Sequence, residues 1–142
     1  WQCIGFQTGR LSICSCSRCR RICSRDTPRI FGSIKSTLSQ ALVDVPQEAT
    51  TVWTFHAPGL ADRLSPDRYP RPTFIAAGHT HGGQIRLPPI PALTPPGSGR
   101  FVAGWYRDTF APLYVSRGIG TTEIRARFLC APEVPLFTLR RT

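Results

Sequence analysis

Apolar side chains recur at helical spacing in one segment that begins shortly after residue 36. The positions are Leu38, Ala41, Leu42 and Val45. Ser36 can act as the N-cap of this helix, and Pro46 ends it because proline cannot continue a helix. A second short helix is predicted over residues 58–64, with Pro58 in its first turn. The pattern therefore predicts two short helices, both in the first half of the chain.

Runs of β-branched and aromatic residues predict six strands after residue 50. They cover residues 51–56, 72–77, 101–106, 113–116, 124–129 and 134–139. The segment from Pro88 to Gly99 contains five Pro and two Gly, which predicts an irregular surface loop between the second and third of these strands. The expected fold class is therefore α+β, rich in strands, with its helices near the start.

Residues 1–30 differ in composition from the rest of the chain. Five of the six cysteines lie in the first 23 residues, among Ser and Arg, with few apolar side chains at helical or strand spacing. We expect a poorly ordered or non-native leader over residues 1–30 and a folded domain over residues 31–142. Three other interpretations stay open: half of a zinc site at Cys16-x-x-Cys19, a disulfide framework, and a basic arm that binds nucleic acid.

The length of 142 residues suits a single domain. Because the chain begins with Trp1 and contains no Met, we expect it to be a fragment or a processed piece. Its formal net charge is +10, and 17 of its 18 basic residues are Arg. This charge favours polyanionic partners such as phosphate esters, nucleic acid or anionic lipid, and Arg suits bidentate contacts with phosphate. The alternative is a general bias toward Arg in the composition, which selects no partner.

Three histidines lie at the ends of predicted strands, where a sheet usually holds reactive groups. His56 ends the strand over residues 51–56, and His79 and His81 follow the strand over residues 72–77 in the motif Gly-His-Thr-His-Gly-Gly-Gln. The glycines let the backbone bend sharply and approach a ligand closely. In a loop that we expect to be extended, His79 and His81 would hold two metal ions side by side, with His56 as a third imidazole. For His56 alone, an ordinary polar histidine is the favoured alternative.

The motif over residues 78–84 resembles the last metal-binding motif of the calcineurin-like metallophosphoesterases. Residues 55–58 (Phe-His-Ala-Pro) and 60–62 (Leu-Ala-Asp) are similar to the motif that precedes it in that family. Residues 104–106, 113–120 and 127–133 resemble the terminal strands of one bacterial branch, which includes phosphodiesterases acting on the UDP-diacylglucosamine precursor of lipid A. The resemblance covers roughly residues 38–140.

The resemblance implies a metal-dependent phosphoester hydrolase built from two β-sheets packed face to face, flanked by helices, of which this chain would be the C-terminal part. It implies two divalent metal ions, Mn, Fe or Zn. His56 and His79 would bind the second ion, and His81 the first. The floor of the substrate site beside the metals would be formed by Gly82, Gly83 and Gln84.

The family's other ligands come from three motifs: Asp-x-His, Gly-Asp-x-x-Asp, and Gly-Asn-His followed by Asp or Glu. None of these motifs occurs here, and the chain contains no Asn. The carboxylate that would bridge two cations is therefore missing. We expect this chain to hold at most one ion weakly and to be inactive on its own, as the C-terminal portion of an enzyme.

The expected partner is a phosphorylated small-molecule or lipid-linked substrate rather than nucleic acid. The expected location is the bacterial cytoplasm or the inner face of the membrane, with peripheral association left open. The alternative function is a non-catalytic basic module that binds nucleic acid or anionic membrane and whose histidines are vestigial.

Overall fold

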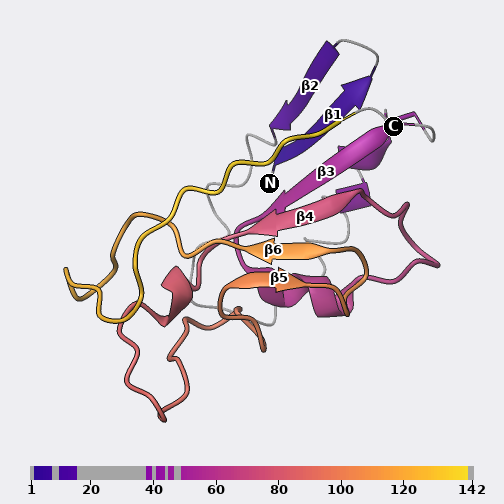
Figure 1. Cartoon of the computed structure of the whole chain (residues 1–142). Helices are drawn as coiled ribbons and strands as arrows, with labels where there is room; N and C mark the ends of the chain where they lie inside the picture. Colours follow the sequence, from indigo (N-terminus) through magenta and orange to yellow (C-terminus); the bar gives the residue numbers. More distant parts are fainter. Residues whose placement is uncertain are drawn as a thin grey trace.

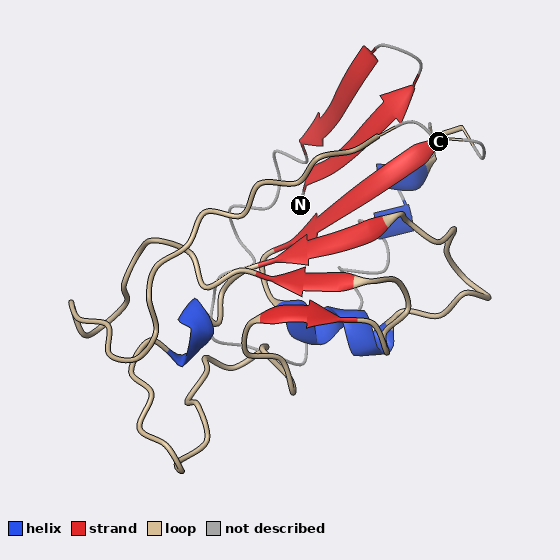
Figure 2. Cartoon of the chain, viewed as in Figure 1, coloured by secondary structure: helices blue, strands red, loops and turns tan. Residues whose placement is uncertain are grey.

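The computed structural model describes residues 2–7, 10–15, 38–39, 41–43, 45–46 and 49–140. Their strands form one mixed sheet in the order β2–β1–β3–β4–β6–β5 (Figures 1 and 2). The strands are β1 (Gln2–Gln7), β2 (Arg10–Ser15), β3 (Thr50–Phe55), β4 (Phe74–Ala77), β5 (Gly104–Tyr106) and β6 (Leu113–Val115). Two short 3-10 helices, η2 (Pro58–Arg63) and η3 (His81–Gly83), follow β3 and β4.

The three central strands β3, β4 and β6 run parallel, and the others pair antiparallel with a neighbour. In the parallel register Phe55 lies opposite Ala77, and Ala77 opposite Val115. The carboxyl ends of the three strands therefore meet at one edge of the sheet. In Figure 1 their arrowheads point the same way, and η3 lies beyond them. The segments that carry the histidines begin at this edge.

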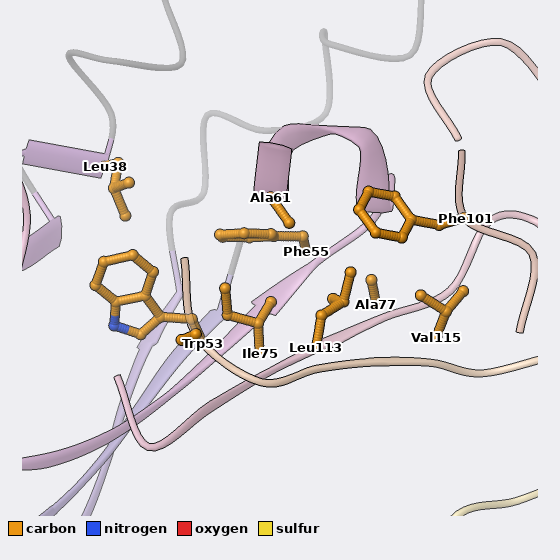
Figure 3. Packing of buried hydrophobic residues seen from close by; sticks show 10 residues of the cluster. Leu38, Trp53, Phe55, Ala61, Ile75, Ala77, Phe101, Leu113 and Val115 are labelled. Atoms are coloured by element: carbon orange, nitrogen blue, oxygen red, sulfur yellow. The ribbon is translucent and has the colours of Figure 1, made fainter. Parts of the chain in front are cut away.

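One face of the sheet carries the main hydrophobic core (Figure 3). Side chains alternate between faces along a strand, so every second residue of β3, β4 and β6 points into this core. These residues are Trp53, Phe55, Ile75, Ala77, Leu113 and Val115. Ala61 of η2 and Phe101 pack over them, both almost fully buried. Burial of Ala61 thus fixes η2, the segment that follows His56, against the sheet.

The opposite face carries a smaller aromatic cluster. Phe74 of β4, Trp105 of β5 and Tyr114 of β6 lie there, and Phe137 from the C-terminal segment packs on all three, with ring centroids 4.8–6.0 Å apart. Trp105 remains 47% exposed. The C-terminal segment therefore crosses this face as an extended chain (Figure 2) and contacts the sheet through its side chains.

Several sequence predictions are confirmed. The strands expected over residues 51–56, 72–77, 101–106 and 113–116 appear as β3, β4, β5 and β6, in part shortened. The helix expected over residues 58–64 is η2, with Pro58 at its start. Helical backbone occurs at residues 38–39 and 41–42, inside the first predicted helix.

Two predicted strands are wrong. Residues 124–129 make only one isolated bridge, between Phe128 and Ile85, and residues 134–139 form no strand. The apolar residues of the first segment suit a strand, but its backbone bonds to the loop after β4 instead of to a strand: Phe128 N–H donates to Gln84 O at 3.0 Å. The second segment contacts the sheet by Phe137, as described above.

The sequence did not predict β1 and β2, which join the sheet through β3. The division of the chain at about residue 30 stays a prediction, and the cysteine-rich segment 16–30 with its zinc hypothesis lies outside the described residues. The two-sheet sandwich is not confirmed, because the strands of the described ranges form a single sheet. Within those ranges, no helix has the length and apolar character to cross a membrane.

Candidate functional site

His56 and His79 lie side by side just beyond the ends of β3 and β4. Their ring centroids are 4.5 Å apart, with the ring planes at 54°. The neighbouring backbone is tied together as well, because Gly78 N–H donates to His56 O at 3.3 Å. This proximity follows from the parallel pairing of β3 and β4, which delivers the next residues of both strands to the same place.

The pKa of His56 is lowered below its ordinary value. Partial desolvation of the ring is the largest cause, although the side chain still reaches solvent, and positive charge on His79 and His81 adds to it. Both histidines are therefore near enough for their charge to act on His56. The neutral imidazole is the form that can bind a metal ion.

The loop after β4 is not extended, so that prediction is wrong. His79, His81 and Gln84 all have positive φ, at 71°, 51° and 46°, and residues 81–83 form the turn η3. Non-glycine residues in this region are strained, and such strain persists only where the surroundings hold it. Buried Thr80 is one support, since its hydroxyl donates to Val102 O at 2.7 Å and accepts from Gly82 N–H at 3.1 Å.

Backbone carbonyls fix which nitrogen of each loop histidine carries the proton. His79 Nε2 lies 2.9 Å from Pro96 O, and His81 Nδ1 lies 3.3 Å from Gly120 O. A carbonyl only accepts, so His79 must donate from Nε2 and His81 from Nδ1. In the neutral rings, Nδ1 of His79 and Nε2 of His81 then keep free lone pairs. Metal-binding histidines characteristically use their other nitrogen in this way.

Gln84 is expected in the floor of the substrate site. In the structure its side chain forms hydrogen bonds to the backbone of another loop. Its amide nitrogen donates to Ile124 O at 2.6 Å, and its carbonyl oxygen accepts from Thr122 N–H at 2.8 Å. The side chain is buried. Gln84 thus joins the histidine loop to residues 122–124, and its substrate role, like that of Gly82 and Gly83, stays a prediction.

Sequence reasoning missed the residues that contact the histidines but lie far from them in the sequence. Pro96 and Gly120 act through backbone carbonyls, which no side-chain motif reveals. Arg127 and Cys130 entered the sequence analysis only as part of the terminal resemblance over residues 127–133. In the structure Cys130 is free and buried, and its thiol lies 3.3 Å from the carbonyl oxygens of both His81 and Gly82.

The described residues do not fit a pair of metal ions. Among them, no three His, Cys, Asp or Glu side chains are grouped so that they could hold an ion. The carboxylate of η2, Asp62, is engaged by Arg100 at 3.2 Å. His56 and His79 are brought together, and His81 does not complete a three-ligand group with them. Two adjacent imidazoles suit one divalent ion.

The chain resembles known metallophosphoesterases over nearly half its length. Over 67 residues, 46% of the chain, it is 46% identical to the uncharacterized metallophosphoesterase YkuE of Bacillus subtilis (strain 168). Over 66 residues it is 38% identical to phosphodiesterase YaeI of Escherichia coli (strain K12). The matches cover 23% and 24% of these relatives, so the chain spans about a quarter of their length. No family model matches the chain, and no solved structure matches it significantly. The resemblance to metallophosphoesterases is thereby confirmed for this part of the chain.

Proposed function

We propose that this chain carries the histidine part of the metal site of a metal-dependent phosphoester hydrolase. The observation that supports this most directly is the His56–His79 pair, 4.5 Å apart at the edge where parallel strands end. The names of the two relatives support the reaction class, and the His56–His79 pair supports a metal site at this edge of the sheet. The second ion and the bridging carboxylate would have to come from outside the residues that the structure describes.

The residues of this chain would bind and orient one ion. The surroundings of His56 lower its pKa and so favour its neutral form, and the Pro96 carbonyl holds the His79 ring by Nε2, away from Nδ1. A divalent ion held there would polarise a phosphoryl oxygen. Imidazole ligands suit Mn, Fe or Zn without selecting among them.

The substrate class that we propose is a phosphorylated small molecule or a lipid-linked phosphate, met in the cytoplasm or at the inner face of the membrane. The net charge of +10 supports a phosphorylated substrate, because it raises the local concentration of anions.

Metal binding by the intact chain tests the proposal. Calorimetric titration with Mn²⁺ should show one weak site, and His79→Ala should remove it. Glu123→Ala serves as the control, because it deletes an exposed carboxylate outside the site. Binding that survives His79→Ala, or that disappears with Glu123→Ala, would show that the metal is held elsewhere.

A further inference from the structure

We propose that Arg127 is a positioning residue that holds the backbone and the tautomer of His81. Only the consequence for metal binding rests on the proposed function. The inference starts from the unusual partners of this side chain: its guanidinium is half-buried and lies among backbone carbonyls of the loops after β4 and β6.

The guanidinium of Arg127 contacts five carbonyl oxygens. Nη2 donates to Gly120 O at 2.6 Å, Arg117 O at 2.7 Å and Gly118 O at 3.2 Å, and Nη1 donates to His81 O at 3.2 Å and Cys130 O at 3.3 Å. Carbonyl oxygens that converge in this way repel one another unless a cation lies between them. Arg is suited to the position because its planar fork presents several donors in fixed directions, whereas Lys is a single point charge.

Two of these contacts act on His81, one through its backbone carbonyl and one through its imidazole ring. The backbone carbonyl of His81 accepts directly from Arg127, which holds the turn η3. The carbonyl of Gly120 accepts from Arg127 and also from His81 Nδ1. Arg127 thus fixes the acceptor that keeps the His81 proton on Nδ1 and leaves Nε2 free to bind a metal.

Gly82 lies in the turn η3, and its surroundings show how closely the segment from residue 117 to residue 130 packs on that turn. A Cβ atom at Gly82 would lie 2.5 Å from Arg117 Cγ and 2.7 Å from Cys130 Sγ. Arg117 is itself held by Glu133, with Nε 2.7 Å from Oε2. The strained positive φ of His81 is therefore supported on one side by Thr80 and on the other by the loop that Arg127 ties together.

The test compares Arg127→Lys with Arg125→Lys in the full chain. Arg125 is exposed, so its substitution changes the same residue type two positions away at the surface. Long-range ¹H–¹⁵N spectra of the imidazole rings, recorded at about pH 8 where a histidine of ordinary pKa is neutral, report which nitrogen carries the proton. In the wild type we expect Nδ1–H for His81 and Nε2–H for His79. Arg127→Lys should remove the Nδ1–H pattern of His81 and leave His79 unchanged, and Arg125→Lys should change neither.

A His81 ring that keeps its Nδ1–H form in Arg127→Lys would overturn the inference, as would an Nε2–H form in the wild type. If Arg127→Lys does not fold, the wild type still decides: the guanidinium protons of Arg127 should exchange with solvent much more slowly than those of Arg125, and equal rates would overturn the inference. Where the complete metal site includes His81, Arg127→Lys should also weaken Mn²⁺ binding by about tenfold, within the range seen for outer-shell partners of metal ligands. A wild type that binds no Mn²⁺ would contradict the proposed function and leave the tautomer result to decide the role of Arg127.

Discussion

His56 and His79 come from different strand ends, and yet their rings lie 4.5 Å apart, closer to each other than the sequence spacing of 23 residues suggests. Parallel pairing of β3 and β4 explains this, since Phe55 lies opposite Ala77 and each histidine follows within two residues. Desolvation and positive charge on His79 lower the pKa of His56, so a proton on His56 is disfavoured beside His79. The two rings are therefore suited to bind one metal ion between them.

The first prediction concerns pH. The folded-state pKa of His56 is lowered from 6.5 by desolvation and by His79 and His81, so the unfolded chain binds a proton more readily than the folded one. The contribution of neutral His56 to the free energy of unfolding should be fully present above pH 6.5 and should be lost as the pH drops through the lowered pKa. NMR titration of the ring protons should give a low pKa for His56, which His79→Ala raises without restoring it fully. A His56 pKa that is unchanged by His79→Ala would contradict the coupling.

A second prediction concerns Glu133. Burial alone would raise its pKa, but hydrogen bonds from Arg117 and from the Tyr114 hydroxyl outweigh burial and lower it. Glu133→Gln should cost roughly 1.5–3 kcal/mol at neutral pH, as expected for hydrogen bonds to a charged group. The difference should vanish as the pH falls through the lowered pKa, where the wild-type carboxyl becomes protonated. Urea denaturation at several pH values measures this, with exposed Glu123→Gln as a control that should stay near zero.

The position of the core can be tested with two leucines. Leu113 of β6 is fully buried in the main core, whereas Leu136 is 91% exposed on the C-terminal segment. Leu113→Ala should lower the free energy of unfolding by about 2–5 kcal/mol. Leu136→Ala should change it by about 0.5 kcal/mol or less. Similar losses for the two variants, measured by denaturant unfolding, would show that the C-terminal segment is part of the main core.

Close backbone packing beside His79 gives a prediction for Gly59 of η2. A Cβ atom there would lie 2.5 Å from Gly97 O, and Gly59 N–H already donates to that oxygen at 3.0 Å. Gly59→Ala should therefore destabilise the protein by about 1–3 kcal/mol. Gly78→Ala is the control, because a Cβ atom there meets no atom within 4 Å. Equal melting temperatures for the two variants would contradict the packing of η2 on residues 97–99.

The sequence predicted those parts of the fold that depend on local pattern. β3, β4 and β6 consist largely of apolar, β-branched or aromatic residues, and in each of them the core-facing positions alternate with the others. The meeting of His56 and His79 was also predictable, because both follow strands that a single sheet would place together. Residues 124–129 have a similar local pattern, but long-range bonds to the loop after β4 decide their conformation.

The support of the histidines could not be predicted, because it depends on backbone atoms far away in sequence. Pro96 lies 17 residues from His79, and Gly120 lies 39 residues from His81. A carbonyl is present at every residue, so its role depends only on the folded arrangement. Arg127 is one of 17 arginines, and its sequence neighbourhood gives no sign that it binds carbonyl groups.

The last prediction is that the 142-residue chain alone is a very poor phosphodiesterase. Two-metal hydrolysis needs a bridged ion pair, which lowers the pKa of the attacking water and clamps the phosphoryl oxygens. The described residues bring together two imidazoles and no carboxylate to bridge ions. Turnover of bis(p-nitrophenyl) phosphate with added Mn²⁺ should therefore be close to the background rate.

Supplying the missing ligands should restore that turnover. The test is a chimera that joins this chain to the part of the Bacillus subtilis relative that the match leaves uncovered, where the missing ligands would have to lie. It should hydrolyse the same substrate in a chelator-sensitive manner, and His79→Ala in the chimera should abolish the activity, whereas Arg125→Lys should leave it unchanged. Robust, chelator-sensitive turnover by the 142 residues alone would contradict the prediction, because a single ion on two imidazoles cannot position a nucleophile in line with the leaving group as an ion pair does.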